Sequence, residues 1–182
     1  MGMLSPLQIL TKYWGFKSFR SSQEEIINEV LARRDTLALL PTGGGKSMCY
    51  QVPSMMQDGI CLVISPLIAL MKDQVSSLQG KGIKAIALNS GMTLSEVDIA
   101  LDNCIYGGYK FLYVSPERLQ NKMVQERLKK MHINLIAVDE AHCISEWGYD
   151  FRPSYQKIAK IRSFINAPLL ALTATATPDV VE

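Results

Sequence analysis

Six short apolar runs alternate with longer stretches of helical periodicity, and this alternation most constrains how the chain can fold. The runs lie at Thr36–Leu40, Ile60–Ser65, Lys84–Leu88, Lys110–Val114, Ile133–Val138 and Pro168–Leu172. They are nearly all apolar rather than alternating, which is typical of strands in a parallel sheet that is covered on both faces. We therefore predict one α/β domain with a mainly parallel sheet, in which right-handed crossovers place helices on both faces.

The composition excludes some classes of protein, but it does not identify a binding partner. The chain has 182 residues, 48% of them hydrophobic, which suits a single packed domain. Its formal net charge of +2 neither requires nor excludes nucleic acid. No apolar run approaches the roughly 20 residues of a membrane span, so we expect no membrane partner. The cysteines, Cys49, Cys61, Cys104 and Cys143, form no CxxC pair. Reduced core thiols are favoured over a zinc site, which indicates a reducing compartment rather than secretion.

Two helix starts are predicted from local patterns. Ser21–Glu24 resembles a capping box, in which a hydroxyl and a carboxylate cap the first turn. Pro116 and Glu117 place proline and an acid where a helix start tolerates them, so a helix is expected from there to Lys129 and Lys130. We interpret those lysines as a solvated face. One face of the first helix carries Ile26, Ile27, Val30 and Leu31.

The first predicted strand runs into a glycine-rich loop that is followed by a helix. This loop comprises Thr42, Gly43, Gly44, Gly45, Lys46 and Ser47. Glycines let backbone amides approach a phosphate, Lys46 would reach the β and γ phosphates, and the Ser47 hydroxyl would bind Mg²⁺. The strict motif begins with Gly or Ala, where this chain has Leu40. The alternative is a glycine-rich turn with an incidental lysine, but the strand before and the helix after favour a nucleotide site.

An acidic motif follows the fifth predicted strand. Asp139 at the strand tip would hold Mg²⁺, and Glu140 would orient and deprotonate the attacking water. His142 could form a structural hydrogen bond or sense the γ-phosphate. A solvated helix start is the alternative, and the coupling to the phosphate loop favours catalysis.

These motifs resemble those of superfamily-two helicases, and in detail those of RecQ DNA helicases. The similar segments are GFKSFRSSQEEI (15–26), LPTGGGKSMCYQVP (40–53), ISPLIALMKDQV (64–75), VDEAHCISEWGYDFRPSY (138–155) and LTATAT (172–177). The resemblance covers almost the whole chain. It implies the N-terminal RecA-like domain of a 3′–5′ DNA helicase of repair or recombination, in the cytoplasm or nucleus, with ATP, Mg²⁺ and DNA as ligands.

The resemblance also implies a limit on what these 182 residues do alone. The second RecA-like domain of such a motor lies outside this sequence. We expect a monomer that binds ATP but neither hydrolyses it efficiently nor unwinds a duplex.

The resemblance assigns an adenine site near the N-terminus. Arg20 and Gln23 match residues that contact adenine, and Phe16 matches an aromatic that stacks near it. From the residues alone, Phe16 and Phe19 would be core anchors, and Arg20 and Gln23 would lie on the surface.

Contacts with DNA are implied in the loops after other strands. The matching residues are Ser65, Lys72, Asn89, Ser90, Ser115 and Arg118. Hydroxyls, amides and basic side chains are the groups that bind phosphates. Ordinary helix caps are the alternative for the two serines, and a simple turn is the alternative for 89–91.

The segment 145–155 resembles the aromatic-rich loop that links DNA binding to hydrolysis. Its candidate residues are Trp147, Tyr149, Phe151 and Arg152, which suit stacking on unpaired bases. The segment departs from the family at Glu146 and Tyr149. The alternative is that these aromatic residues form one face of a β-strand. Thr173 and Thr175 would relay hydrogen bonds between the γ-phosphate and the DNA, unless they only complete a strand.

Two other functions stay open. An RNA helicase of the DEAD or DEAH type would share the phosphate loop and the acidic motif, and the aromatic segment argues against it. A nucleic-acid-binding module that uses ATP without turnover is disfavoured by Glu140.

Overall fold

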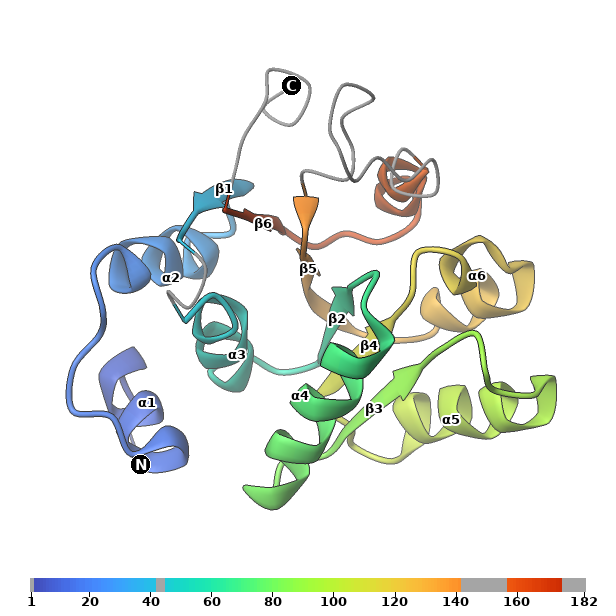
Figure 1. Ribbon diagram of the computed structural model, residues 1–182, viewed down its shortest axis with the longest axis horizontal. Helices are drawn as coiled ribbons and strands as arrows, with labels where there is room; N and C mark the ends of the chain where they lie inside the picture. Colours follow the sequence, from blue (N-terminus) through green and yellow to red (C-terminus); the bar gives the residue numbers. More distant parts are fainter. Residues whose placement is uncertain (1, 42–44, 142–156, 175–182) are drawn as a thin grey trace.

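The computed structural model describes residues 2–41, 45–141 and 157–174, and its centre is one parallel sheet. The six strands are β1 (Thr36–Leu39), β2 (Ile60–Ile64), β3 (Ala85–Leu88), β4 (Phe111–Val114), β5 (Ile133–Val138) and β6 (Leu169–Thr173). Every predicted strand is present, with ends that differ by at most one residue. Their order in the sheet is β1-β6-β5-β2-β4-β3, and every pair is parallel (Figure 1).

Helices cover both faces of the sheet, as the sequence predicts. The helices are α1 (Pro6–Trp14), α2 (Gln23–Leu31), α3 (Met48–Met55), α4 (Ile68–Gly80), α5 (Leu94–Tyr106) and α6 (Lys122–Leu128), with 3₁₀ turns η1 (Arg118–Gln120) and η3 (Ile158–Ser163). Side chains of β2 alternate between two cores, because successive residues of a strand point to opposite faces. Cys61 and Val63 meet α2, α3 and α4, whereas Leu62 and Ile64 meet α5, α6 and η3. Helix α1 packs in a third cluster with α2 and α3.

The two predicted helix starts are both wrong in detail. Helix α2 begins at Gln23, and its N-cap Ser22 is left-handed (φ 70°) with no side-chain capping bond. The region after Pro116 is a turn followed by η1, and α6 begins only at Lys122. Asn121 interrupts the expected helix because its side chain accepts the backbone N–H groups of Met123 and Val124, which makes it the N-cap of α6.

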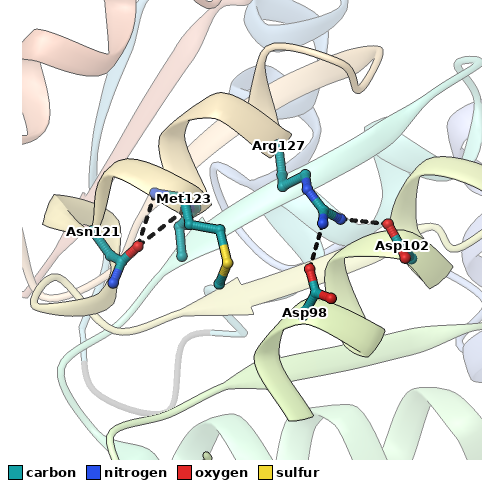
Figure 2. A network of polar contacts seen from close by, with 6 residues as sticks. Asp98, Asp102, Asn121, Met123 and Arg127 are labelled. Carbon is teal, nitrogen blue, oxygen red and sulfur yellow. Dashed lines mark hydrogen bonds and ion pairs between the residues drawn. The ribbon is translucent and has the colours of Figure 1, made fainter. Parts of the chain in front are cut away.

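The short helix α6 is held against α5 by one arginine (Figure 2). The guanidinium of Arg127 donates to Asp98 and to Asp102, which lie one turn apart on α5. These carboxylates are half exposed, and exposed ion pairs add little stability. We therefore infer that this network orients α6 and adds little to the stability of the fold. As expected, Lys129 is solvated, and it pairs with Glu126 at 2.8 Å.

Three of the four cysteines lie in the described residues, and all three are free and buried. Burial raises the pKa of the Cys49, Cys61 and Cys104 thiols to about 12. They are therefore protonated core side chains, as the sequence predicts. None of the helices in the described part of the chain is long and apolar enough to cross a bilayer.

Candidate nucleotide-binding site

The glycine-rich loop joins β1 to α3 at the carboxyl edge of the sheet (Figure 1). Leu40, between β1 and this loop, is buried in the core, and its backbone N–H donates to the Thr173 carbonyl at 3.1 Å. This packing gives a physical role to the leucine that departs from the strict motif. At the other end of the loop, Gly45 has φ 71°, a left-handed conformation that glycine adopts without strain. The Gly45 carbonyl accepts the Met48 N–H at 3.2 Å, which leads into α3.

The side chain of Gln23 forms a hydrogen bond with this loop at Gly45. Its amide nitrogen donates to the Gly45 carbonyl at 3.0 Å, and its amide oxygen accepts the Arg20 N–H at 2.8 Å. A Cβ on Gly45 would lie 2.3 Å from the Gln23 amide nitrogen, so another residue here would displace the end of the Gln23 side chain. Gln23 is only 3% exposed, and the alternative of a surface glutamine is therefore wrong. The predicted capping box is absent because the N-cap of α2, Ser22, is left-handed and makes no side-chain capping bond.

The other two residues assigned to adenine lie on the surface. Arg20 is exposed, and Phe16 is 51% exposed, so Phe16 is no core anchor. Phe19 is partly buried and packs on the cluster of α1, α2 and α3, as an anchor should. The adenine contacts themselves stay a prediction.

The two acidic residues at the end of β5 lie at an unusual backbone turn. Asp139 continues the sheet, its N–H donating to the Ile64 carbonyl at 2.9 Å. Glu140 has φ 55°, a conformation that is costly for a residue with a Cβ and that is often kept at functional sites. Its N–H donates to the Asp139 carboxylate at 2.9 Å. The two adjacent acids therefore differ in backbone conformation and in their hydrogen bonds.

The described part of the phosphate loop and Asp139 meet at one cavity of about 280 Å³. Gly45, Lys46, Ser47, Ser65 and Asp139 line it, together with Tyr50, Val63, Leu70, Met71, Gln74 and Tyr113. The Lys46 ammonium lies 3.8 Å from a carboxylate oxygen of Glu140. An ammonium, a hydroxyl and a carboxylate at one cavity are the groups that bind a phosphate and a hard divalent cation. The residues present therefore fit Mg²⁺ with a nucleotide.

The sequence reasoning missed a buried polar network on the wall of this cavity. The hydroxyls of Tyr50 and Tyr113 lie 3.0 Å apart, and the Gln51 amide donates to Tyr113 and to Gln74 at 3.1 and 2.9 Å. The network joins α3, which follows the phosphate loop, to β4 and α4. Burial raises the pKa of both tyrosines, so both keep their protons. Tyrosines inside otherwise apolar segments were the available signal.

We expect Tyr113→Phe to lower the free energy of unfolding by about 1–3 kcal/mol, since the buried Tyr50 hydroxyl would then lose its bond to Tyr113, although Gln51 would keep its bond to Gln74. Tyr106→Phe is the matched control because Tyr106 is 81% exposed. Urea unfolding followed by circular dichroism measures both. Equal midpoints for the two variants would show that the network carries no stability.

The residues assigned to DNA gather at the same edge, because β2, β4 and β3 are neighbours. Ser65 and Ser115 are buried, and their hydroxyls accept the N–H groups of Leu67 and Arg118, each at 3.4 Å. Neither serine is a helix cap, because the N-caps of α4 and η1 are Leu67 and Glu117 and neither helix has a side-chain capping bond. The Asn89 side chain accepts the Gly91 N–H at 2.9 Å, which is the turn that was the other alternative.

Two basic residues assigned to DNA differ in their surroundings. The Arg118 guanidinium donates to the carbonyls of Asn89 and Met92, so it joins the loops after β3 and β4. Lys72 is exposed on α4, and Ser90 is also exposed. Thr173 is fully buried at the end of β6. Contacts of these residues with DNA stay a prediction.

Nine candidate residues lie outside the described part of the chain. They are Thr42, Gly43 and Gly44 of the phosphate loop, His142, the aromatic-segment residues Trp147, Tyr149, Phe151 and Arg152, and Thr175.

Comparison with known proteins identifies the class to which this fold and cavity belong. A family model described as DEAD/DEAH box helicase matches residues 20–182, and the chain belongs to that family. Within it, the chain is similar to the probable ATP-dependent DNA helicase RecS of Bacillus subtilis (strain 168), with 50% identity over 177 residues. It is 48% identical over 171 residues to the ATP-dependent DNA helicase RecQ of Haemophilus influenzae. The resemblance to RecQ helicases is thus confirmed.

The match covers nearly all of this chain but a minority of each relative. It spans 96% of the chain and 35% of the RecS protein, and 93% of the chain and 28% of the RecQ protein. The fold also resembles that of the DUF1998 helicase MrfA in its crystal structure with DNA and AMPPNP. The TM-score is 0.75 at 17% identity, over 97% of this chain and 27% of that one. The predicted α/β fold is thereby confirmed.

Proposed function

We propose that the chain is the ATP-binding first motor domain of a RecQ-type 3′–5′ DNA helicase that acts in repair or recombination. The observation that carries this proposal is the single cavity in which Lys46, Ser47 and Asp139 meet beside Glu140. Relatives at 48–50% identity that are described as ATP-dependent DNA helicases support it.

Each group at the cavity has a chemical task in ATP hydrolysis. The Lys46 ammonium binds the β and γ phosphates, with the N–H groups at the start of α3. Ser47 and Asp139 would hold Mg²⁺, which neutralises phosphate charge when bound. Glu140 accepts a proton from the attacking water. Because Lys46 is paired with Glu140 at 3.8 Å, phosphates that attract the ammonium would release this carboxylate for its task as a base.

The sheet order brings the proposed DNA contacts next to the nucleotide cavity. Ser65 lines that cavity and begins the loop after β2, whose neighbour in the sheet is β4. The loop after β4 is tied by Arg118 to the loop after β3. Changes at the phosphates would therefore be transmitted through β2 and α4 to a DNA strand that lies across these three loops.

We expect the chain alone to bind MgATP but not to unwind DNA. A second lobe would supply the positive charge that stabilises the transition state, a contribution of about 10³ to 10⁵ in rate in comparable enzymes. Translocation also needs two lobes that open and close. Strand-displacement and phosphate-release assays on the purified chain measure this. Unwinding, or turnover at ordinary helicase rates, would contradict the proposal.

The choice between DNA and RNA is tested by nucleic-acid binding. We expect a labelled single-stranded DNA to bind more tightly than an RNA of the same sequence. Fluorescence anisotropy at fixed salt compares the two. Tighter binding of the RNA would favour the RNA helicase alternative.

A further inference from the structure

A second pocket, of about 240 Å³, lies between η1–α6 and η3. Three lysines line it: Lys122 at the start of α6, and Lys157 and Lys160 in and just before η3. Pro116 also lines it, directly after Ser115 at the end of β4. One side of the pocket therefore begins directly after β4, whose neighbours in the sheet are β2 and β3.

These lysines differ from the basic residues around them. Arg127 pairs with Asp98 and Asp102, Lys129 with Glu126, and Arg162 with Asp35. In contrast, no ion pair among the described residues involves Lys122, Lys157 or Lys160, and all three are exposed. Three ammonium groups at one pocket repel one another, because salt at 0.1 M screens the interaction between two charges only beyond about 10 Å. An anion in the pocket would remove that repulsion.

The floor and the amides of the pocket favour a phosphate of a long ligand over a buried small anion. Ile158 and Ile161 are buried and line the pocket together with the three exposed lysines, whose side chains are flexible apolar stems that end in ammonium groups. The Gln125 amide donates to the Leu119 carbonyl at 2.9 Å, which fixes the wall between η1 and α6. A lysine binds phosphate as a point charge without a fixed geometry. This suits the phosphates of a nucleic-acid backbone that moves along the protein.

We propose that this lysine pocket (Lys122, Lys157 and Lys160) binds a backbone phosphate of the single strand that lies across the neighbouring loops. The inference rests on the proposed function and extends it by three residues that no motif includes. Phosphate contacts position a strand and carry no sequence information. The pocket should therefore strengthen binding equally for strands of any sequence.

The test replaces all three lysines by glutamine and compares this variant with a control of equal charge. The control replaces Lys12, Lys81 and Lys130, which are exposed and lie outside both pockets described above. Both variants change the net charge from +2 to −1 (2 − 3 = −1). Anisotropy titrations with labelled oligothymidine and with a mixed-sequence strand, from 50 to 200 mM salt, give the affinity and its salt slope. MgATP affinity and thermal unfolding check that each variant is folded.

We expect the pocket variant to bind both strands about tenfold more weakly, with a salt slope shallower by about 0.7 for each phosphate that the lysines no longer neutralise. The control should change affinity by much less. Equal reductions of affinity in the two variants, with the parent chain binding DNA, would overturn the lysine pocket and leave the proposed function intact. A parent chain that binds MgATP but no strand would overturn both the pocket and the DNA-binding part of the proposed function.

Discussion

Replacing Lys46 by alanine is expected to weaken MgATP binding by about a hundredfold, because truncating one partner of a desolvated charge pair costs about 2–5 kcal/mol. The Lys46 side chain is only 20% exposed, and its ion pair with Glu140 places the ammonium at the cavity. The fold should survive, since Lys46 belongs to none of the three hydrophobic clusters. Anisotropy of a fluorescent ATP analogue measures the change.

Lys81→Ala is the matched control for this experiment. It removes the same charge from an exposed position just after α4, outside the nucleotide cavity. Unchanged affinity in Lys46→Ala, or an equal reduction in Lys81→Ala, would remove Lys46 from the site.

The largest effect on stability is expected for Gly59→Ala, a decrease of about 2–4 kcal/mol in the free energy of unfolding. Gly59 has φ 95°, and an added Cβ would lie 2.3 Å from the backbone carbonyl oxygen of His132. That carbonyl also accepts the Ile60 N–H at 2.8 Å, where β2 begins to pair with β5. The clash therefore falls on backbone that cannot move without breaking the centre of the sheet.

Gly80→Ala provides the contrast, because nothing lies within 4 Å of a Cβ at this last residue of α4. We expect it to be neutral or to raise the free energy of unfolding by up to about 1 kcal/mol, since alanine favours helix over glycine. Urea unfolding of both variants gives the comparison. A Gly59→Ala midpoint equal to that of the parent chain would refute the packing described here.

The strands could be predicted from the sequence, whereas their order could not. A buried parallel strand shows itself as a local apolar run, as Ile133–Val138 does. The order β1-β6-β5-β2-β4-β3 depends on pairing between residues far apart in the chain, such as Leu39 with Thr173. Local sequence patterns do not indicate which distant residues pair in the sheet.

The helix starts failed for a related reason. The pattern at Ser21–Glu24 satisfies a local rule, but Ser22 is left-handed and makes no capping bond, and Gln23 beside it donates to Gly45, 22 residues away. After Pro116, the Asn121 cap competes with helix continuation and prevails. At Asn121 one capping contact outweighs a helix propensity of less than about 1 kcal/mol per residue.

Much of the candidate site could be predicted, because glycines, a lysine and acids after strands leave a local signature. The structure brings Lys46, Ser47 and Asp139 to one cavity, with Glu140 paired to Lys46. The tyrosine network could not be predicted, since it needs the contact of Tyr50 with Tyr113 across two elements. The structural use of Arg118 was hidden for the same reason.

A calorimetric titration of the purified chain with ATP, in the presence of Mg²⁺ and then with excess EDTA, tests the central claim most directly. We expect saturable one-to-one binding with Mg²⁺ and an affinity at least about tenfold lower without it, because Ser47 and Asp139 would hold the cation against the phosphates. No binding by the parent chain, or the same affinity in EDTA, would contradict the assignment of this cavity as a MgATP site.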